Sequence, residues 1–380
     1  MKAYIIYTSF LDFNTNQVTI GGIQTYIADL VKLLTDLELK TYVLQYGDRD
    51  ETAAVGNYTV VQIKSDNAHL LVEKAAKSFI DIEKDLVIYG TDTLISKDII
   101  FKNSIAIQHG IWWDQPEMGK GSRLKSLLPF LPSSFFLRRE VKAQNKNAWQ
   151  IISRLNYVKR VVCVDYNFVN WYRTYVKSQR TDLFVVPNYT KIGSRLEKPD
   201  GDINIIFARR FFWYRGTRIF TPAIKKILNE YDQVHVTIAG SGPDEVWMRQ
   251  QLADCRNVNF INYKADESLK IHSKQHIAVV PTVGSEGTSL SLLEAMSAQC
   301  AVVCTDVGGM TSIVLNGYNG KIVRAGDSDE LYLAIKYLLD NPNEVKRMAA
   351  CGYETVKQCF SHEVWVNSWK KIIEEMIYGK

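Results

Sequence analysis

The chain has 380 residues, of which 46% are hydrophobic and 23% are charged. This length is more than one ordinary core needs and suits two domains, and the composition excludes an intrinsically disordered protein. The 46 basic and 41 acidic side chains leave a formal charge of only +5, which argues against nucleic acid as a partner. No run reaches the roughly 18 apolar residues that a membrane span needs.

The cysteines form no CxxC pair and no cluster with zinc spacing; they are Cys163, Cys255, Cys300, Cys304, Cys351 and Cys359. Most lie in apolar segments, as reduced core thiols do, so we expect a cytoplasmic protein. The N-terminal run 1–7 is too short for the core of a signal peptide and is expected to form the first strand.

In the first half, short runs rich in β-branched residues alternate with longer amphipathic segments. Helical periodicity is clearest at 22–37 and 141–158. Such alternation predicts a parallel sheet with helices on both faces. The predicted strands are 3–7, 41–46, 58–63, 86–89, 104–107, 161–164 and 183–186.

A polar break at 193–202 follows Pro187-Asn188, and the alternation then restarts. We therefore predict an α/β protein of two doubly wound, Rossmann-like domains that face each other across a cleft. The predicted domains are 1–190 and 200–360, and the sequence leaves open which of them the last helix, within 361–380, packs on. The second series of strands is 203–208, 234–239, 258–261, 277–281 and 301–304, with helices at 217–230, 289–298, 329–340 and 343–358.

Ligands of doubly wound folds bind at the carboxyl ends of strands, and two features of the second series follow strands directly. The loop 207–216 holds Arg209, Arg210 and Arg215. Guanidinium forks match phosphate oxygens, so a diphosphate is one partner to expect, and a solvated basic loop is an equal alternative. The turn Gly240-Ser241-Gly242-Pro243 suits close approach to a ligand, but a plain strand-to-helix turn needs the same glycines.

A third feature is the segment 285–294, which joins a predicted strand to a helix that begins at about 288. Free amides at a helix start bind anions, and the helix dipole adds to this. Gly287 leaves room for a phosphate, and Glu286 and Glu294 can accept hydrogen bonds from sugar hydroxyls. A carboxylate among leucines, as at Glu294, has no evident structural task. This segment therefore predicts a nucleotide-sugar site.

With Glu286 and Glu294 in an E-x7-E pattern, the chain resembles the retaining GT-B glycosyltransferases of family GT4. Arg210 and Arg215 stand at the positions of that family's R-x4-K pair. The resemblance covers nearly the whole chain. Its other matching segments are Gly21-Gly22, Gln108-His109-Gly110, Pro187-Asn188, Gly240-Ser241-Gly242-Pro243, Glu294-Ala295-Met296, Val302-Val303 and Asp306-Val307-Gly308-Gly309.

The resemblance implies an enzyme that moves a hexose-type sugar from a UDP- or GDP-sugar to a glycan or lipid-linked acceptor, with retention by front-face attack. It implies that Arg210 and Arg215 neutralise the diphosphate and that His109 lies near the reacting groups. It also implies that Glu286 holds the transferred sugar and that Glu294 holds the ribose of the nucleotide. Enzymes of this kind commonly build bacterial surface polysaccharides. No cofactor is implied. The donor-binding residues that it implies are Gly21, Gly22, Gly240, Gly242, Gly287, Thr288, Ser289 and Glu294.

The chain departs from the family pattern in the expected walls of the substrate site. Arg215 replaces a lysine, Gln299 and Ala301 replace a glycine and a proline, and Ser312 stands where glutamate is common. Three Asp-x-Asp triplets could bind a divalent cation, but they lie in polar loops away from the other features, so we predict charged turns and no metal. The triplets are Asp48/Asp50, Asp200/Asp202 and Asp327/Asp329.

The segment 120–146 mixes cationic with apolar residues. One interpretation is peripheral contact with anionic lipid at the inner face of the membrane, and an equal one is a helical excursion packed on its own domain.

Two alternatives to glycosyl transfer stay open at this stage: a sugar-nucleotide epimerase on the same scaffold, and a non-catalytic subunit that binds a nucleotide sugar. A dinucleotide oxidoreductase fits poorly, because Gly21-Gly22 lacks the G-x-G-x-x-G spacing.

Overall fold

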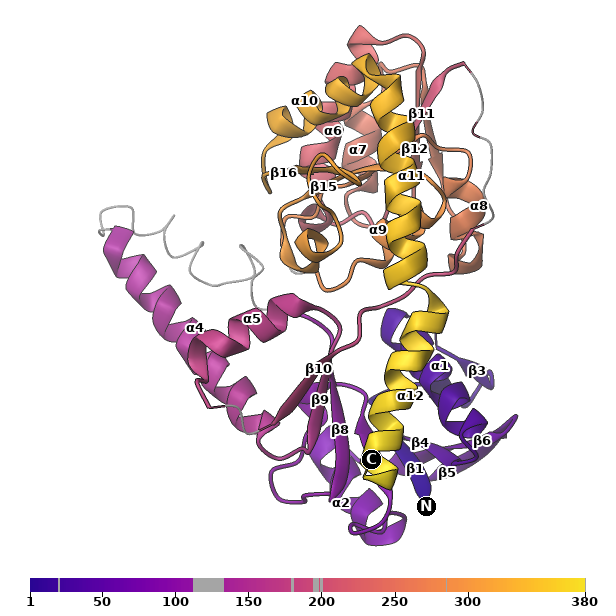
Figure 1. Ribbon diagram of the computed structural model, residues 1–380, viewed down its shortest axis with the longest axis vertical. Helices are drawn as coiled ribbons and strands as arrows, with labels where there is room; N and C mark the ends of the chain where they lie inside the picture. Colours follow the sequence, from indigo (N-terminus) through magenta and orange to yellow (C-terminus); the bar gives the residue numbers. More distant parts are fainter. Residues whose placement is uncertain are drawn as a thin grey trace. The chain divides into compact units, whose positions relative to one another are not determined.

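The computed structural model describes residues 1–19, 21–111, 133–178, 181–193, 198, 201–284 and 286–379. Its described residues form two compact units, both of which are parallel sheets flanked by helices (Figure 1). The first unit consists of the described residues of 1–109, 128–186 and 366–380, and the second of those of 110–127 and 187–365.

The main sheet of the first unit is parallel except at its edge, where β5 runs antiparallel to β6. Its strands are β1 (Lys2–Ile6), β4 (Lys40–Gly47), β5 (Glu51–Val55), β6 (Tyr58–Lys64), β7 (Leu86–Tyr89), β8 (Asn103–Gln108), β9 (Arg160–Cys163) and β10 (Asp182–Val185). They lie in the order β10-β9-β8-β7-β1-β4-β6-β5. Central strands such as β7 are buried along their whole length, as expected for a parallel sheet covered on both faces.

The helices of this unit are α1 (Gly22–Asp36), α2 (Ala68–Ser78), α4 (Ser133–Leu155), α5 (Tyr166–Tyr175) and the greater part of α12 (His362–Tyr378), with a 3-10 turn, η1 (Asp92–Leu94), and a hairpin of β2 (Leu11–Asp12) and β3 (Gln17–Val18). The apolar stripe of α12 packs within the first unit, where Trp369 is fully buried and its indole Nε1 donates to the hydroxyl of Tyr26 at 2.7 Å. The guanidinium of Arg160 donates to the carbonyl oxygen of Ile372 at 2.7 Å. The chain therefore completes this unit only with its last helix.

The second unit has a fully parallel sheet in the order β13-β12-β11-β14-β15-β16. Its strands are β11 (Ile203–Ala208), β12 (Val234–Ala239), β13 (Val258–Ile261), β14 (Ile277–Val280), β15 (Ala301–Thr305) and β16 (Lys321–Val323). Numbered by sequence within the unit, this is the order 3-2-1-4-5-6 of a doubly wound sheet, and its direction of winding reverses between β11 and β14.

Helices cover both faces of this sheet and give it two apolar layers. One layer packs α6 (Thr217–Glu230), α7 (Glu245–Gln251) and α10 (Ser328–Asp340) against the strands; the other packs α9 (Leu290–Ser297) and α11 (Pro342–Cys359). Short elements complete the unit: η3 (Trp213–Arg215), η4 (Ala265–Glu267), α8 (Ser268–His272) and η5 (Gly308–Ser312). No helix in the described ranges is long and apolar enough to span a membrane.

Candidate functional site

The predicted arginine and glutamate features meet at the switch point of the second unit. Arg209 follows β11 directly, and Thr282 and Glu286 lie in the loop after β14, its hydrogen-bonded neighbour. Crevices at such switch points are where open α/β sheets bind their ligands.

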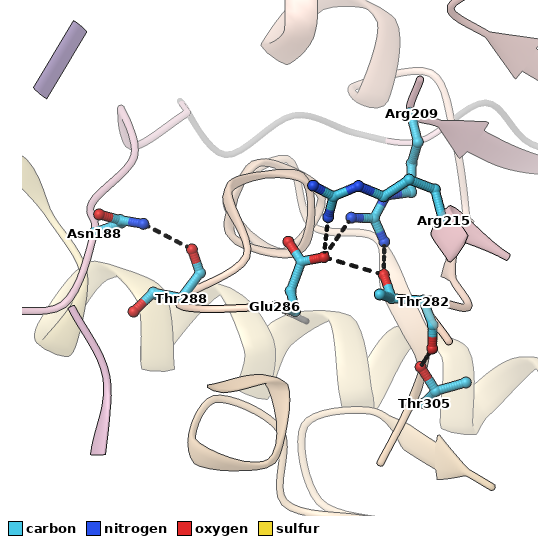
Figure 2. Close-up of polar contacts among 7 residues, drawn as sticks. All are labelled: Asn188, Arg209, Arg215, Thr282, Glu286, Thr288 and Thr305. Carbon is cyan, nitrogen blue, oxygen red and sulfur yellow. Dashed lines mark hydrogen bonds and ion pairs between the residues drawn. The ribbon is translucent and has the colours of Figure 1, made fainter. Parts of the chain in front are cut away.

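One carboxylate oxygen of Glu286 is the centre of this cluster (Figure 2). Arg209 Nη2 lies 2.8 Å from Oε2, Arg215 Nη1 is hydrogen-bonded to the same oxygen, and Thr282 Oγ1 donates to it at 3.2 Å. Arg209 Nη1 also donates to the Thr282 hydroxyl. The side chains of Arg209 and Glu286 are 3% and 10% exposed, whereas Arg215 is 22% exposed. Arg215 is therefore the cation of this cluster that a ligand can reach most easily.

Arg210, which the R-x4-K spacing selected, does not join this cluster. It is exposed, and its guanidinium lies 5.7 Å from the ring centre of Phe212. Its neighbour Arg209 pairs with Glu286 instead. Both arginines lie in the loop after β11, and only the first of them turns inward.

The charges around Glu286 hold it in its ionised form. Burial by itself raises the pKa of this carboxyl, but the charges of Arg209 and Arg215 and the hydrogen bonds from Arg209 and Thr282 outweigh burial and lower it. Burial lowers the pKa of Arg209, yet a guanidinium remains charged because its ordinary pKa lies far above neutrality. The three side chains therefore carry a net charge of about +1 at neutral pH.

Two glycines let backbone segments close around this cluster. Gly308 has φ +53, and a Cβ there would lie 2.0 Å from the carbonyl oxygen of Glu286, which also accepts a hydrogen bond from the Gly309 amide at 2.8 Å. Gly240 has φ +138, and its Cβ would lie 2.1 Å from the carbonyl oxygen of Arg209. Gly240 thus has a structural role, and Gly308, for which no role was predicted, lets its loop lie directly against the backbone of Glu286.

The N-terminus of α9 has free backbone amides that, like the arginines, can attract an anion. Ser289 is the N-cap residue but makes no capping hydrogen bond, and its hydroxyl is buried with no hydrogen-bond partner in the described structure. An N-cap serine ordinarily satisfies one of the free amides of its own helix. Asn188 Nδ2 donates to the carbonyl oxygen of Thr288 at 2.9 Å and anchors the preceding loop (Figure 2). Gly287 is half-buried in this loop, and Ser285 lies outside the described residues.

Glu294 lies in the same helix, in an environment opposite to that of Glu286. Burial raises the pKa of its carboxyl, and one hydrogen bond, from Ser268 Oγ to Oε2 at 2.6 Å, acts against that shift. The nearby phenol of Tyr263 has its pKa raised to about 12 by burial and by the charge of Glu294. Glu294 is thus a buried carboxylate without a cationic partner in the described structure.

His109, Gly21 and Gly22 belong to the first unit. His109 follows β8, and its Nε2 lies 2.9 Å from the carbonyl oxygen of Gly90, which can only accept, so Nε2 carries the proton. Burial lowers the pKa of His109 to about 4, which leaves a neutral ring with Nδ1 as an acceptor. Gly21 and Gly22 form the N-cap and first residue of α1, which follows the β2–β3 hairpin.

The predicted charged turns have structural partners where they are described. Asp327 caps α10 by accepting from the amides of Asp329 and Glu330, Asp50 accepts from the Lys64 amide at 2.7 Å, and Asp202 pairs with His235 at 2.9 Å. Asp200 lies outside the described residues. Within the described ranges, no group of three or more His, Cys, Asp or Glu residues is arranged to hold a metal.

Residues 188–355 match the model of the family glycosyl transferases group 1. The second unit is therefore similar in sequence to group 1 glycosyltransferases. Over its length the chain is similar to an uncharacterized glycosyltransferase of Methanocaldococcus jannaschii, with 25% identity over 94% of this chain and 95% of that protein. A phosphatidyl-myo-inositol mannosyltransferase of Mycobacterium leprae is 28% identical over 38% of this chain and 39% of its own length.

Solved structures extend the likeness from the second unit to both units. Sucrose-phosphate synthase from Thermosynechococcus elongatus has a TM-score of 0.72 at 15% identity, with both chains fully covered. Anabaena HepE in complex with UDP has a TM-score of 0.71 at 17% identity, with 99% of each chain covered. The predicted GT-B fold of two Rossmann-like units is thereby confirmed, and the sequence matches support glycosyl transfer as the activity.

The buried ion pairs of Glu286 should make the stability of the second unit depend on pH in a defined way. Because the pKa of Glu286 is lowered in the folded state, its contribution is fully present above the unfolded value of about 4.3 and is lost as the pH falls through the lower, folded value. Glu286→Gln should cost about 3 kcal/mol at neutral pH, since it leaves two arginines uncompensated.

Urea unfolding at a series of pH values measures this difference. We expect the gap between wild type and Glu286→Gln to be constant from about pH 8 to pH 5 and to shrink below about pH 4. Glu354→Gln, at an exposed position of α11, is the matched control and should match wild type throughout. A gap that widens toward acid pH would contradict the ionised state of Glu286.

Proposed function

We propose that the chain is a metal-independent, retaining glycosyltransferase of the GT4 type that moves a hexose-type sugar from a UDP- or GDP-sugar to a glycan or lipid-linked acceptor. The observation that carries the proposal is the combination at one switch point of a cation cluster, Arg209 and Arg215, with a helix start whose N-cap hydroxyl is buried and unpaired. Both are donors for a diphosphate, and the match of residues 188–355 supports a donor site there.

In this proposal the arginines and the α9 amides bind the donor diphosphate and stabilise the charge that develops on it as the sugar leaves. Arg215 is the main contact because it is more exposed than Arg209. Arg209 and Thr282 act mainly by holding Glu286 in place. Glu286 offers its other carboxylate oxygen to hydroxyls of the transferred sugar, and Arg210 remains a candidate for an outer phosphate contact.

The proposed transfer step needs no nucleophile from the protein. The bond between the anomeric carbon and the phosphate oxygen breaks, the acceptor oxygen bonds to the same face of that carbon, and the acceptor proton passes to the leaving phosphate. His109 fits a binding role better than a role as a base in this step, because burial holds its pKa at about 4 and its Nδ1 accepts a hydrogen bond.

A donor screen with release of nucleoside diphosphate as the readout tests this proposal. We expect one preferred donor, a rate that EDTA leaves unchanged, and a loss of at least about tenfold in Glu286→Gln, which is roughly 1.4 kcal/mol of transition-state stabilisation. Glu354→Gln should keep the wild-type rate.

Three outcomes contradict parts of the proposal. Unchanged turnover in Glu286→Gln contradicts the site, and inhibition by EDTA contradicts metal independence. Donor binding without release across the whole panel supports a non-catalytic subunit instead.

For a lipid-linked acceptor, we propose that α4 touches anionic membrane. The segment 120–132 lies outside the described residues, and its continuation in α4 exposes Leu137 at 61%, Val141 at 50% and Trp149 at 73%. Leu137 and Val141 are one turn apart, and Trp149 follows two turns later, so they share a side of the helix. Exposed cations accompany them: Arg138, Arg139, Lys142 and Lys146. Basic and apolar side chains together suit anionic headgroups.

Sedimentation with vesicles tests the membrane proposal. Wild type should pellet with vesicles of phosphatidylcholine and phosphatidylglycerol but not with phosphatidylcholine alone, and the double variant Lys142→Glu with Trp149→Ser should stay in solution. Leu333→Ser removes a similarly exposed apolar side chain from α10 and should pellet like wild type. Equal pelleting of wild type and the double variant would contradict contact through α4.

A further inference from the structure

Ser268 connects α8 to the carboxylate of Glu294. Its hydroxyl lies 2.6 Å from Oε2 of Glu294, and the side chains of both residues are largely enclosed. An ionised carboxylate can only accept, so the serine hydroxyl is the donor. A carboxylate in an apolar helix with one neutral donor is free to rotate or to take up a proton unless that donor is fixed.

His272 fixes the direction of the serine hydroxyl. Its Nδ1 lies 2.8 Å from the carbonyl oxygen of Ser268 and 3.3 Å from the hydroxyl oxygen. Because the carbonyl oxygen cannot donate, Nδ1 must carry a proton. The hydroxyl proton of Ser268 therefore has no acceptor on His272 and is directed to Glu294.

Lys198 holds α8 beside the end of α9. Its ammonium donates to the carbonyl oxygens of His272 and Ser273, both at 3.2 Å, and to that of Ala298 at 2.5 Å. The first two close α8 and the third follows α9, so one cation satisfies carbonyl groups that both helices leave free at their C-termini. The distance from Ser268 to Glu294 is thereby set by packing and not by the two side chains alone.

We propose that Ser268 is a positioning residue for Glu294: it fixes this carboxylate for the ribose-binding role that the family resemblance implies, an inference that rests on the proposed function. Ser268 occupies Oε2, which leaves Oε1 as the acceptor for the ribose. The 2′-hydroxyl is the group that this carboxylate distinguishes, because a 2′-deoxy nucleotide leaves a buried acceptor unpaired.

Calorimetric titration with UDP, GDP and their 2′-deoxy forms tests the inference. For whichever of UDP and GDP binds more tightly, wild type should bind the ribonucleotide about tenfold or more tightly than its 2′-deoxy form. This is the range expected for the loss of a hydrogen bond to a charged group. Ser268→Ala should reduce this preference to about threefold or less while the affinity for the 2′-deoxy form stays nearly unchanged. Ser273→Ala removes a hydroxyl from the same segment that bonds only locally, to the Lys270 carbonyl oxygen, and should keep the full preference.

Two further variants separate positioning from folding. Ser268→Thr retains the hydroxyl and should keep the preference for the ribonucleotide. Ser268→Cys keeps nearly the same side-chain size but is a weaker hydrogen-bond donor, so it should lower this preference. It serves as the test if Ser268→Ala does not fold. An undiminished preference in Ser268→Ala or Ser268→Cys overturns the inference. Equal binding of both sugars by wild type overturns the assignment of Glu294 to ribose. Failure of wild type to bind either ribonucleotide contradicts the proposed function itself.

Discussion

The second unit depends on one interaction: a buried carboxylate oxygen of Glu286 that receives two guanidinium groups. Removing such charges from water is costly unless each is paired, so Arg209, Arg215 and Glu286 constrain one another. This constraint explains why the loop after β11 must reach the loop after β14, and why Gly308 must lack a side chain against the Glu286 backbone. The pairing of these three charges therefore contributes to the stability of the second unit, apart from any role in binding a ligand.

The two glutamates of this segment, eight residues apart, have pKa values shifted in opposite directions. Glu286 is held ionised by cations, whereas Glu294 has no cationic partner among the described residues, and burial raises its pKa. Environments that push the pKa values of two carboxyls apart commonly assign them different tasks. Here the first carboxylate organises positive charge around the start of α9, and the second, through Ser268, is suited to neutral hydroxyls.

Much of this could be predicted from the sequence because it depends on local periodicity. The five predicted strands of the second series and the helices α1, α6, α9, α10, α11 and α12 lie within a few residues of their predicted ranges, whereas the sixth strand, β16, was not predicted. The short β2–β3 hairpin and the edge strand β5 were not predicted, since their few residues carry no clear alternation. The ion pair of Arg209 with Glu286 was not predicted, because spacing along a loop does not tell which side chain turns inward. Thr282 and Ser268 gave no signal in the sequence, and the Pro187-Asn188 motif did not reveal that Asn188 bonds to a residue 100 positions away.

A crystal structure of the chain with UDP or GDP bound would show where the nucleotide lies. We expect the diphosphate at the N-terminus of α9, within hydrogen-bond distance of Arg215 and of the Ser289 hydroxyl, and the ribose on Glu294. A nucleotide bound away from residues 286–294, with Ser289 still unpaired, would contradict this expectation.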